Sequence, residues 1–308
     1  MTGAVVPGSV GELLRSATQR LREAGSETAR LDAELLLGHV LHIDRATVLA
    51  HPEAGVGPQQ TDAYRTAVER RAAGEPVAYI RGIKEFYGLA LAVDRRALIP
   101  RPETELLVEL GLERLRSLLI EHPRPPGAAP VRVWDVGTGS GAIVVVVAVE
   151  ARRRGYGRDV RFRATDISAD ALALAVENAV VHGVADVIEF AHADLLALAG
   201  AEPVELVVAN LPYIPTVFVP ALPPAASFEP TLALDGGTDG LEVIRRLMAQ
   251  LPAMTTPDGS CLLEIGAEQE EPFRLAAREL LPGWQLDIHH DLAGQPRVAA
   301  LSAGAPAG

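Results

Sequence analysis

The stretch Val131-Arg132-Val133-Trp134, followed at once by Asp135-Val136-Gly137-Thr138-Gly139-Ser140-Gly141, decides the fold. Its first part is a short run of β-branched and aromatic residues, which is typical of a strand. Its second part is a glycine loop, whose small residues allow a tight turn and let a ligand approach the backbone where a helix begins. The combination predicts a nucleotide-type pocket, although a plain strand-to-helix turn has a similar composition.

Strand and helix signals alternate after this loop, which predicts an α/β fold with a doubly wound, mostly parallel sheet. Residues 142–149 contain four successive valines. Valine runs favour a strand, but the position directly after the glycine loop favours a crossover helix. The other expected strands are 160–164, 187–190, 204–209, 260–265 and a final one at 284–290, and the other expected helices are 103–120, 169–182, 241–251 and 273–281.

Residues 10–73 instead carry apolar side chains at helical spacing, which predicts a small domain of four short helices. Gly25-Ser26 separates the first two helices, Asp44 is the expected N-cap of the third, and Thr61 or Asp62 that of the fourth. Residues 86–93 predict a strand or hairpin. We therefore expect a helical domain over residues 1–84, a hairpin linker over 85–98 and a sheet domain over 99–308.

Composition limits the classes of partner. The chain has 308 residues, room for two domains, and a formal net charge of −12, which makes duplex nucleic acid a poor partner and favours a protein. The single cysteine, Cys261, lies in an apolar stretch and is expected to be a buried structural thiol. No membrane span, signal pattern or metal-ligand spacing is visible, so the sequence predicts a cytoplasmic protein without a metal site.

Two aspartates follow expected strands and extend the pocket. Asp166 closes the second strand, where a carboxylate can accept hydrogen bonds from both hydroxyls of a ribose. Asp194, with Leu195 beside it, ends the third strand at the expected adenine edge. Both aspartates are alternatively helix caps. Because the loop with Ala142 also fits the dinucleotide pattern G-x-G-x-x-A, these features leave a nicotinamide cofactor and S-adenosylmethionine both open.

The segment Asn210-Leu211-Pro212-Tyr213 follows the apolar run at 204–209 and favours methyl transfer, because hydride transfer has no need of this motif. An amide or exocyclic amine nitrogen is a weak nucleophile, since its lone pair is delocalised. The Asn210 side-chain oxygen and the Leu211 carbonyl can each accept one N–H of such a group, and Tyr213 can stack on it. The alternative reading is a strand followed by an ordinary turn.

Together these residues resemble the class I S-adenosylmethionine-dependent methyltransferases, and more narrowly the release factor glutamine methyltransferase (HemK/PrmC) family. Further segments carry the resemblance over residues 10–300: Gly74-Glu75-Pro76-Val77-Ala78-Tyr79-Ile80, Leu98-Ile99-Pro100-Arg101-Pro102-Glu103-Thr104-Glu105, Phe228-Glu229-Pro230, Ala233-Leu234-Asp235-Gly236-Gly237, Leu262-Leu263-Glu264-Ile265-Gly266 and Asp291-Leu292-Ala293-Gly294. The family implies a seven-stranded methyltransferase sheet preceded by a small helical bundle.

The resemblance also implies an activity and a site. The activity is methyl transfer from S-adenosylmethionine to the side-chain amide of the Gly-Gly-Gln glutamine of class 1 peptide chain release factors. The helical domain is expected to dock the release factor, and we expect the enzyme to be a monomer. Gly137, Thr138, Gly139, Ser140 and Gly141 are expected to cradle the methionine part of the cofactor, Asp166 to bind its ribose, and Asp194 with Leu195 its adenine. Asn210, which also adjoins the cofactor, Leu211, Pro212 and Tyr213 are expected to receive the glutamine. Arg101, Glu103 and Glu229 are expected to shape the substrate entrance.

One residue departs from the family pattern, which normally reads Asn-Pro-Pro-Tyr, because Leu211 stands at its second position. Asn-Leu-Pro-Tyr is associated with methylation of the amino nitrogen of adenine in ribosomal RNA. A nucleic-acid adenine methyltransferase, an amide or amine methyltransferase of secondary metabolism, and a cofactor-binding scaffold without catalysis therefore remain as alternatives. Leucine retains the backbone carbonyl that the motif uses, and the acidic charge disfavours nucleic acid.

Overall fold

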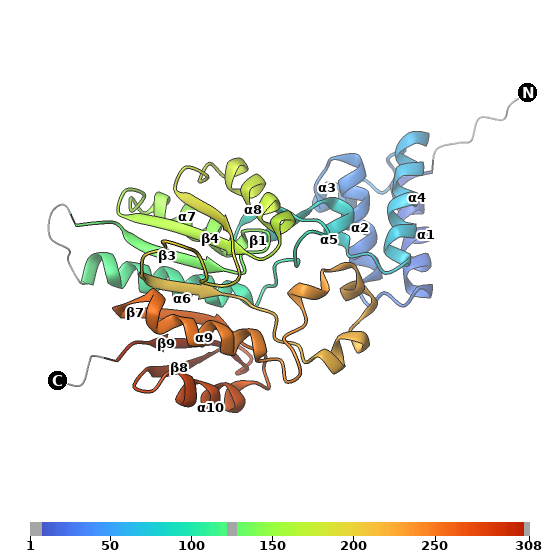
Figure 1. Cartoon of the computed structure of the whole chain (residues 1–308). Helices are drawn as coiled ribbons and strands as arrows, with labels where there is room; N and C mark the ends of the chain where they lie inside the picture. Colours follow the sequence, from blue (N-terminus) through green and yellow to red (C-terminus); the bar gives the residue numbers. More distant parts are fainter. Residues whose placement is uncertain (1–7, 122–127, 305–308) are drawn as a thin grey trace, which may run out of the picture. The chain divides into compact units, whose positions relative to one another are not determined.

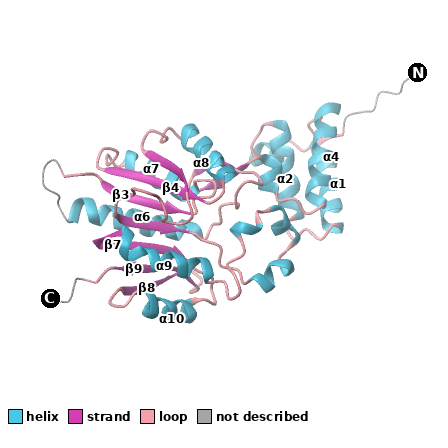
Figure 2. Cartoon of the chain, viewed as in Figure 1, coloured by secondary structure: helices cyan, strands magenta, loops and turns pink. Residues whose placement is uncertain are grey.

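The computed structural model describes residues 8–121 and 128–304, and the chain divides into two compact units. One unit contains the described residues up to Ile83 together with Pro223–Phe228. The other contains Lys84–Leu222 and the described residues from Glu229 onward. Figure 1 shows the elements in chain order, and Figure 2 shows that the first unit is helical and that the second combines strands with helices.

The helical unit is held together by the apolar stripes that the sequence predicts, with Leu21, Leu36 and Leu37 fully buried. The Asp44 side chain caps the third helix, as predicted, by accepting the Thr47 N–H at 2.7 Å. The elements of this unit are α1 (Val10–Glu23), α2 (Ala29–Leu41), α3 (Arg45–Ala50), α4 (Pro58–Ala72), α5 (Val77–Arg81) and the 3₁₀ turn η3 (Pro224–Phe228).

Two expectations for this unit are wrong. The fourth helix starts at Pro58, with Gly57 as its N-cap, earlier than Thr61 or Asp62. Proline at the first helical position has no N–H to leave unpaired, and the Gln60 side chain accepts the Gly57 N–H at 3.3 Å. A fifth helix, α5, is also present, and the sequence analysis missed it because it is only one turn long.

The second unit is built on a seven-stranded sheet in the order β5-β4-β3-β6-β7-β9-β8, which confirms the expected fold class. β9 is antiparallel to both of its neighbours, and the pairs from β5 to β7 are parallel. The strands are β3 (Val131–Val136), β4 (Val160–Asp166), β5 (Ile188–His192), β6 (Val204–Ala209), β7 (Thr255–Glu264), β8 (Gln285–His290) and β9 (Pro296–Ser302), with a separate hairpin of β1 (Ile83–Phe86) and β2 (Leu89–Ala92).

The expectation that residues 284–290 form the last strand is wrong, because β9 follows and lies between β7 and β8. Its sequence begins with proline and contains two alanines, residues of low strand propensity. Val298, Ala299 and Leu301 are nevertheless buried in the apolar clusters on the two faces of the sheet. The tertiary position of β9 therefore stabilises a strand that its local sequence does not predict.

Helices cover both faces of this sheet. Apolar residues of α6 (Thr104–Arg116) and α7 (Ala142–Arg153) pack with Val133 and Val208 on one face. Residues of α9 (Glu242–Met254) and α10 (Glu270–Leu280) pack with Trp134 and Val207 on the other. The helix α8 (Ala169–Val181) contacts α7, β4 and β5. Cys261 is fully buried in the apolar cluster that contains Trp134 and Val207, as predicted.

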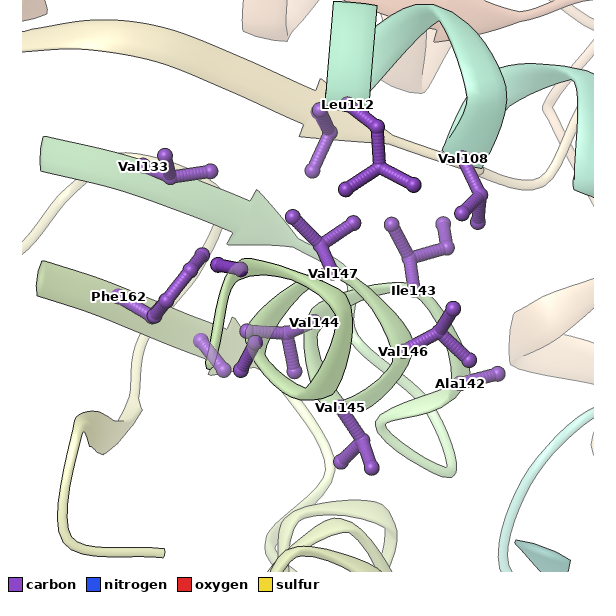
Figure 3. Packing of buried hydrophobic residues seen from close by; sticks show 14 of the residues in the cluster. Val108, Leu112, Val133, Ala142, Ile143, Val144, Val145, Val146, Val147 and Phe162 are labelled. Carbon is purple, nitrogen blue, oxygen red and sulfur yellow. The ribbon is translucent and has the colours of Figure 1, made fainter. Parts of the chain in front are cut away.

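The valine run is helical, as its context predicts. Val144, Val145, Val146 and Val147 lie in α7 and are at most 1% exposed. Figure 3 shows α7 between Val133 and Phe162 of the sheet and Val108 and Leu112 of α6. A helix that is apolar on all sides is stable when every side is buried, which explains why strand propensity does not decide here.

The sheet changes its direction of winding at β3 and β6, and this switch point positions the site. β4 pairs with one edge of β3 and β6 with the other, with Val136 opposite Ala209. The glycine loop and Asn210 therefore begin side by side at the carboxyl ends of neighbouring strands. In open α/β sheets ligands bind at this place. Among the described residues no helix is both long and apolar enough to cross a membrane.

A substitution at Gly141 tests whether the packing of α7 against α8 requires glycine at this position. Its φ is +78°, and a Cβ there would lie 3.0 Å from the Ala175 Cβ of α8. Gly155 has a similar φ of +85° but open space around it, which makes it a matched control. We expect Gly155→Ala to lower the free energy of unfolding by about 1 kcal/mol from backbone strain. Gly141→Ala should lower it by about 1–3 kcal/mol more, because α7 and α8 must separate. Urea denaturation measures both, and equal losses would contradict the packing role.

Candidate active site

A cavity lies at the carboxyl ends of the parallel strands, entirely within the sheet unit. Residues at or just after the carboxyl ends of β3, β4, β5 and β6 line this cavity, so one edge of the sheet supplies most of its wall. The remaining wall comes from residues 96–98, from residues 230–235 and from α9. The lining residues that the sequence analysis singled out are Gly137, Gly139, Asp166, Asp194, Leu195, Asn210, Leu211 and Pro212.

The other predicted residues do not line this cavity within the described part of the chain: Thr138, Ser140, Gly141, Tyr213, Arg101, Glu103 and Glu229. Thr138 and Ser140 are buried and shape the loop from behind. The Thr138 hydroxyl donates to Asp135 Oδ2 at 2.7 Å, and the Ser140 carbonyl accepts a hydrogen bond from Asn178 at 2.9 Å. Gly141 is the N-cap of α7.

Asp166 ties the loop to the neighbouring strand end. Its Oδ2 accepts the Gly139 N–H at 2.9 Å, and its Oδ1 accepts the Ser168 N–H at 2.8 Å. Burial raises the pKa of its carboxyl above the usual range, and these N–H groups oppose the rise. Each oxygen keeps a further lone pair, so Asp166 can still accept hydroxyl hydrogens. The N-cap of α8 is Ser168, so the alternative reading of Asp166 as that cap is wrong.

Asp135 precedes the glycine loop, and the sequence predicts no role for it. It is completely buried behind the glycine loop, and burial raises the pKa of its carboxyl to about 7. Oδ2 accepts from Thr138 and from the Val144 N–H at 3.2 Å, whereas Oδ1 has no partner within the described residues. The available signal was an acidic residue at the end of an otherwise apolar strand.

The Leu195 backbone is strained. Its φ is +57°, a left-handed conformation that costs a residue with a Cβ about 1–2 kcal/mol. Two buried hydrogen bonds run toward it: Trp134 Nε1 donates to Thr165 Oγ1 at 2.9 Å, and Thr165 Oγ1 donates to the Leu195 carbonyl at 3.1 Å. This chain of bonds holds Leu195 against the cavity, beside Asp194, whose carboxylate pairs with Arg246 of α9.

Leu211, the departure from the family pattern, packs on the glycine loop. It is 3% exposed, and a Cβ added to Gly137 would lie 2.8 Å from Leu211 Cδ2. Gly137 also has a φ of +69°. Glycine is therefore required at position 137 both by its backbone conformation and by the leucine beside it.

Asn210 and Tyr213 are fixed by bonds to other elements. Asn210 Nδ2 donates to Thr104 Oγ1 of α6 at 3.1 Å. The Tyr213 carbonyl accepts from Gln269 Nε2 at 2.9 Å, and burial raises the pKa of the Tyr213 hydroxyl to about 12. Tyr213 is therefore neutral at physiological pH and presents an uncharged ring.

Arg101 and Glu229 form one clasp. Their side chains pair at 2.5 Å, and Glu229 also accepts the Ile99 N–H at 3.1 Å. The Glu229 side chain is only 2% exposed. The clasp joins the segment before α6 to the segment that supplies Pro230 to the cavity wall. Glu103 stands at the start of α6 without a side-chain capping bond.

The cavity suits a nucleoside with a cationic sulfonium. Gly137 and Gly139 bring backbone into the wall, and the carboxylates of Asp166, Asp194 and Asp235 line it together with the guanidinium groups of Arg96 and Arg246, the second of which pairs with Asp194. Carboxylates accept hydrogen bonds from hydroxyl and amino groups and attract a positive charge. Groups of this kind fit the hydroxyl and amino groups and the positive charge of S-adenosylmethionine.

Comparison with known proteins agrees with this geometry. A family model described as RMKL-like, methyltransferase domain, matches residues 119–216, and one described as PrmC N-terminal domain matches residues 12–82. The catalytic domain of human Mettl16 in complex with a 3′UTR hairpin shares the fold, with a TM-score of 0.51, 17% identity and 80% of each chain covered. The fold and the site thus define an α/β methyltransferase.

Close relatives narrow the class. The chain is 39% identical over 295 residues to the release factor glutamine methyltransferase of Deinococcus radiodurans, covering 95% of this chain and 98% of that one. It is 37% identical over 286 residues to the enzyme of that name from Moorella thermoacetica, covering 93% and 95%. The protein described here belongs to the release factor glutamine methyltransferase family.

The buried Asp135 carboxyl predicts how stability depends on pH. Its folded-state pKa is about 7, well above the ordinary value of an aspartate, so folding favours the protonated form. The free energy of unfolding should therefore fall as pH rises from about 4 to about 7, and Asp135→Asn should show a shallower decline. Urea titrations across this range measure the slopes. Asp159→Asn, at an exposed turn, is the control and should keep the slope of the unchanged protein. An equal slope in Asp135→Asn would contradict the assignment.

Proposed function

We propose that this protein transfers a methyl group from S-adenosylmethionine to the side-chain amide nitrogen of the Gly-Gly-Gln glutamine of class 1 peptide chain release factors. The observation that carries the proposal is Asn210 at the cavity wall, one residue beyond β6 and beside the glycine loop. The names of the relatives in Deinococcus radiodurans and Moorella thermoacetica support the release factor as substrate.

The cofactor would be held by the four strand ends. Gly137 to Gly141 would cradle its methionine part, with Thr138, Ser140 and Gly141 acting through the loop backbone and its shape. Asp166 would accept the ribose hydroxyls, Asp194 would accept from the adenine amino group, and Leu195 would contact the ring. When bound, this cofactor supplies a methyl group that is already activated by its sulfonium.

The substrate amide would be gripped at its two N–H groups. Asn210 Oδ1 and the Leu211 carbonyl would each accept one of them, and Tyr213 would stack on the amide plane. Pro212 would stiffen the turn that presents these groups. Arg101, Glu103 and Glu229 would shape the entrance, with the Arg101–Glu229 clasp holding the segment at Pro230.

Positioning would supply most of the rate enhancement. Well-oriented reactants gain on the order of 7–11 kcal/mol from proximity and alignment, more than general acid–base catalysis usually gives. The methylated amide nitrogen is strongly acidic before it loses its proton, so water can accept that proton afterwards. No dedicated base is therefore assigned among the residues of the site.

The helical domain would dock the release factor. We propose the boundaries 1–84 for this domain, 85–98 for the hairpin linker and 99–308 for the catalytic domain. The match of residues 12–82 to the PrmC N-terminal domain supports the first of these. A net charge of −12 favours a protein partner over nucleic acid, and we propose a cytoplasmic monomer.

Leu211 favours a second candidate, methylation of the adenine amino nitrogen in nucleic acid. Both substrates present a planar NH₂ group, so Asn210 could accept from either. The decisive experiment supplies the purified protein with radiolabelled S-adenosylmethionine and, separately, with a release factor, its Gly-Gly-Gln variant carrying Gln→Ala, and ribosomal RNA. Mass spectrometry then locates the label. Methyl groups on the glutamine support the proposal, and methyl groups on RNA alone overturn it.

Two substitutions should separate substrate grip from cofactor binding. Asn210→Ala removes the proposed acceptor and should lower kcat at least about a hundredfold, because misplacement of the nucleophile has effects of this size. S-adenosylmethionine affinity, measured by isothermal titration calorimetry, should change little. Asp166→Ala should weaken that affinity first. An Asn210→Ala protein with unchanged turnover would remove Asn210 from the mechanism.

A further inference from the structure

A second buried acid lies beside the active-site motif. Glu264 is the last residue of β7, which pairs with β6 so that Leu263 lies opposite Ala209. Glu264 and Asn210 are therefore the next residues of two neighbouring strands. Glu264 is 2% exposed, and its Oε2 has no hydrogen-bond partner within the described residues. A buried carboxyl oxygen without a hydrogen-bond partner destabilises a fold, so a functional reason for it must be sought.

Thr104 connects this acid to Asn210. Thr104 is 3% exposed, and its Oγ1 accepts a hydrogen bond from Asn210 Nδ2 at 3.1 Å. Thr104 and Asn210 also lie close enough to the Glu264 carboxyl to lower its pKa, against the effect of burial. The three side chains come from α6, β7 and the end of β6, so only the folded sheet unit brings them together.

The number of hydrogens that these groups can donate determines how the Asn210 carboxamide is oriented. An ionised carboxylate only accepts, and a threonine hydroxyl has a single hydrogen to donate. If that hydrogen goes to Glu264, Thr104 offers only lone pairs to Asn210, which must then turn its NH₂ toward Thr104. The Asn210 oxygen is then free to accept a substrate N–H at the cavity wall that Asn210 lines.

We propose that Thr104 and Glu264 are positioning residues that set the orientation of the Asn210 carboxamide, so that its oxygen and not its NH₂ faces the substrate. This inference rests on the proposed function, because it concerns how Asn210 accepts the amide. It assigns a role to two residues of the family-like segments for which the motif itself gives none.

The charge state of Glu264 supports the same geometry. Burial raises the pKa of its carboxyl to about 7, with Glu103 adding to the rise and Arg297 opposing it. The nearby Tyr213 hydroxyl stays neutral, since its pKa is about 12. When protonated, Glu264 can donate to Thr104, which frees the threonine hydrogen for the Asn210 oxygen and reverses the carboxamide. Turnover should therefore rise as pH rises through about 7.

The test compares four variants with the unchanged protein, using an intact release factor as substrate. Thr104→Val removes the hydroxyl but keeps the shape, and should lower kcat at least about tenfold while KM and S-adenosylmethionine affinity stay within about twofold. Thr104→Ser restores the hydroxyl and should restore most of kcat. Glu264→Gln should lower kcat and lose the rise near pH 7. Thr255→Val is the control, because Thr255 is buried at the other end of β7, and it should leave kcat unchanged.

A double substitution gives the sharpest readout. In an Asn210→Ala protein, Thr104→Val should have no further effect on kcat, because coupled residues lose their effect together. Full activity of Thr104→Val and Glu264→Gln in a protein that methylates the release factor would overturn this inference alone. Failure of the unchanged protein to methylate the release factor would overturn the proposed function and this inference with it. If urea denaturation shows that Thr104→Val does not fold, Glu264→Gln decides.

Discussion

The parallel pairing of β3 with β6 is the constraint on which the rest of the site depends. Val136 lies opposite Ala209, so the residues that follow both strands start from the same line at the edge of the sheet. The contact of Leu211 with Gly137 is a direct consequence of this register. A shift by one residue would turn every side chain of the strand to the other face, and the cofactor loop and the substrate motif would no longer meet.

This arrangement explains why the cavity is surrounded by buried polar groups in an otherwise apolar sheet. Asp135 is the residue before the last of β3 and Glu264 is the last residue of β7, and burial raises the pKa of both carboxyls to about 7. Each has one oxygen without a partner among the described residues. Asp135 shapes the glycine loop through Thr138, and Glu264 faces Asn210 through Thr104. The sheet thus provides rigid, low-dielectric support on which single hydrogen bonds set the geometry of the site.

Elements that the sequence did not reveal share one physical property, which is that their stability comes from neighbours distant in the chain. β9 contains proline and alanines but is paired on both sides. Leu195 adopts a left-handed backbone while its carbonyl is held by Thr165, whose hydroxyl oxygen accepts from Trp134. Residues Pro223–Phe228, although they follow the active-site strand, belong to the helical unit, where Pro224 lies 3.3 Å from the Cβ position of Gly74. Local propensity carries no information about any of these contacts.

The sequence by itself determined the class of fold, the helical nature of the valine run, the N-cap at Asp44 and the four strand ends that line the cavity. These features depend on local patterns: alternation of strand and helix, a glycine loop after a strand, and polar residues after apolar runs. Tertiary structure alone decided which predicted residues reach the cavity and which support it from behind. Thr138 and Ser140 point into the core, Arg101 is bound to Glu229, and Thr104 meets Asn210 across 106 residues of chain. Side-chain direction and partner choice depend on packing between elements, and no pattern within one element encodes them.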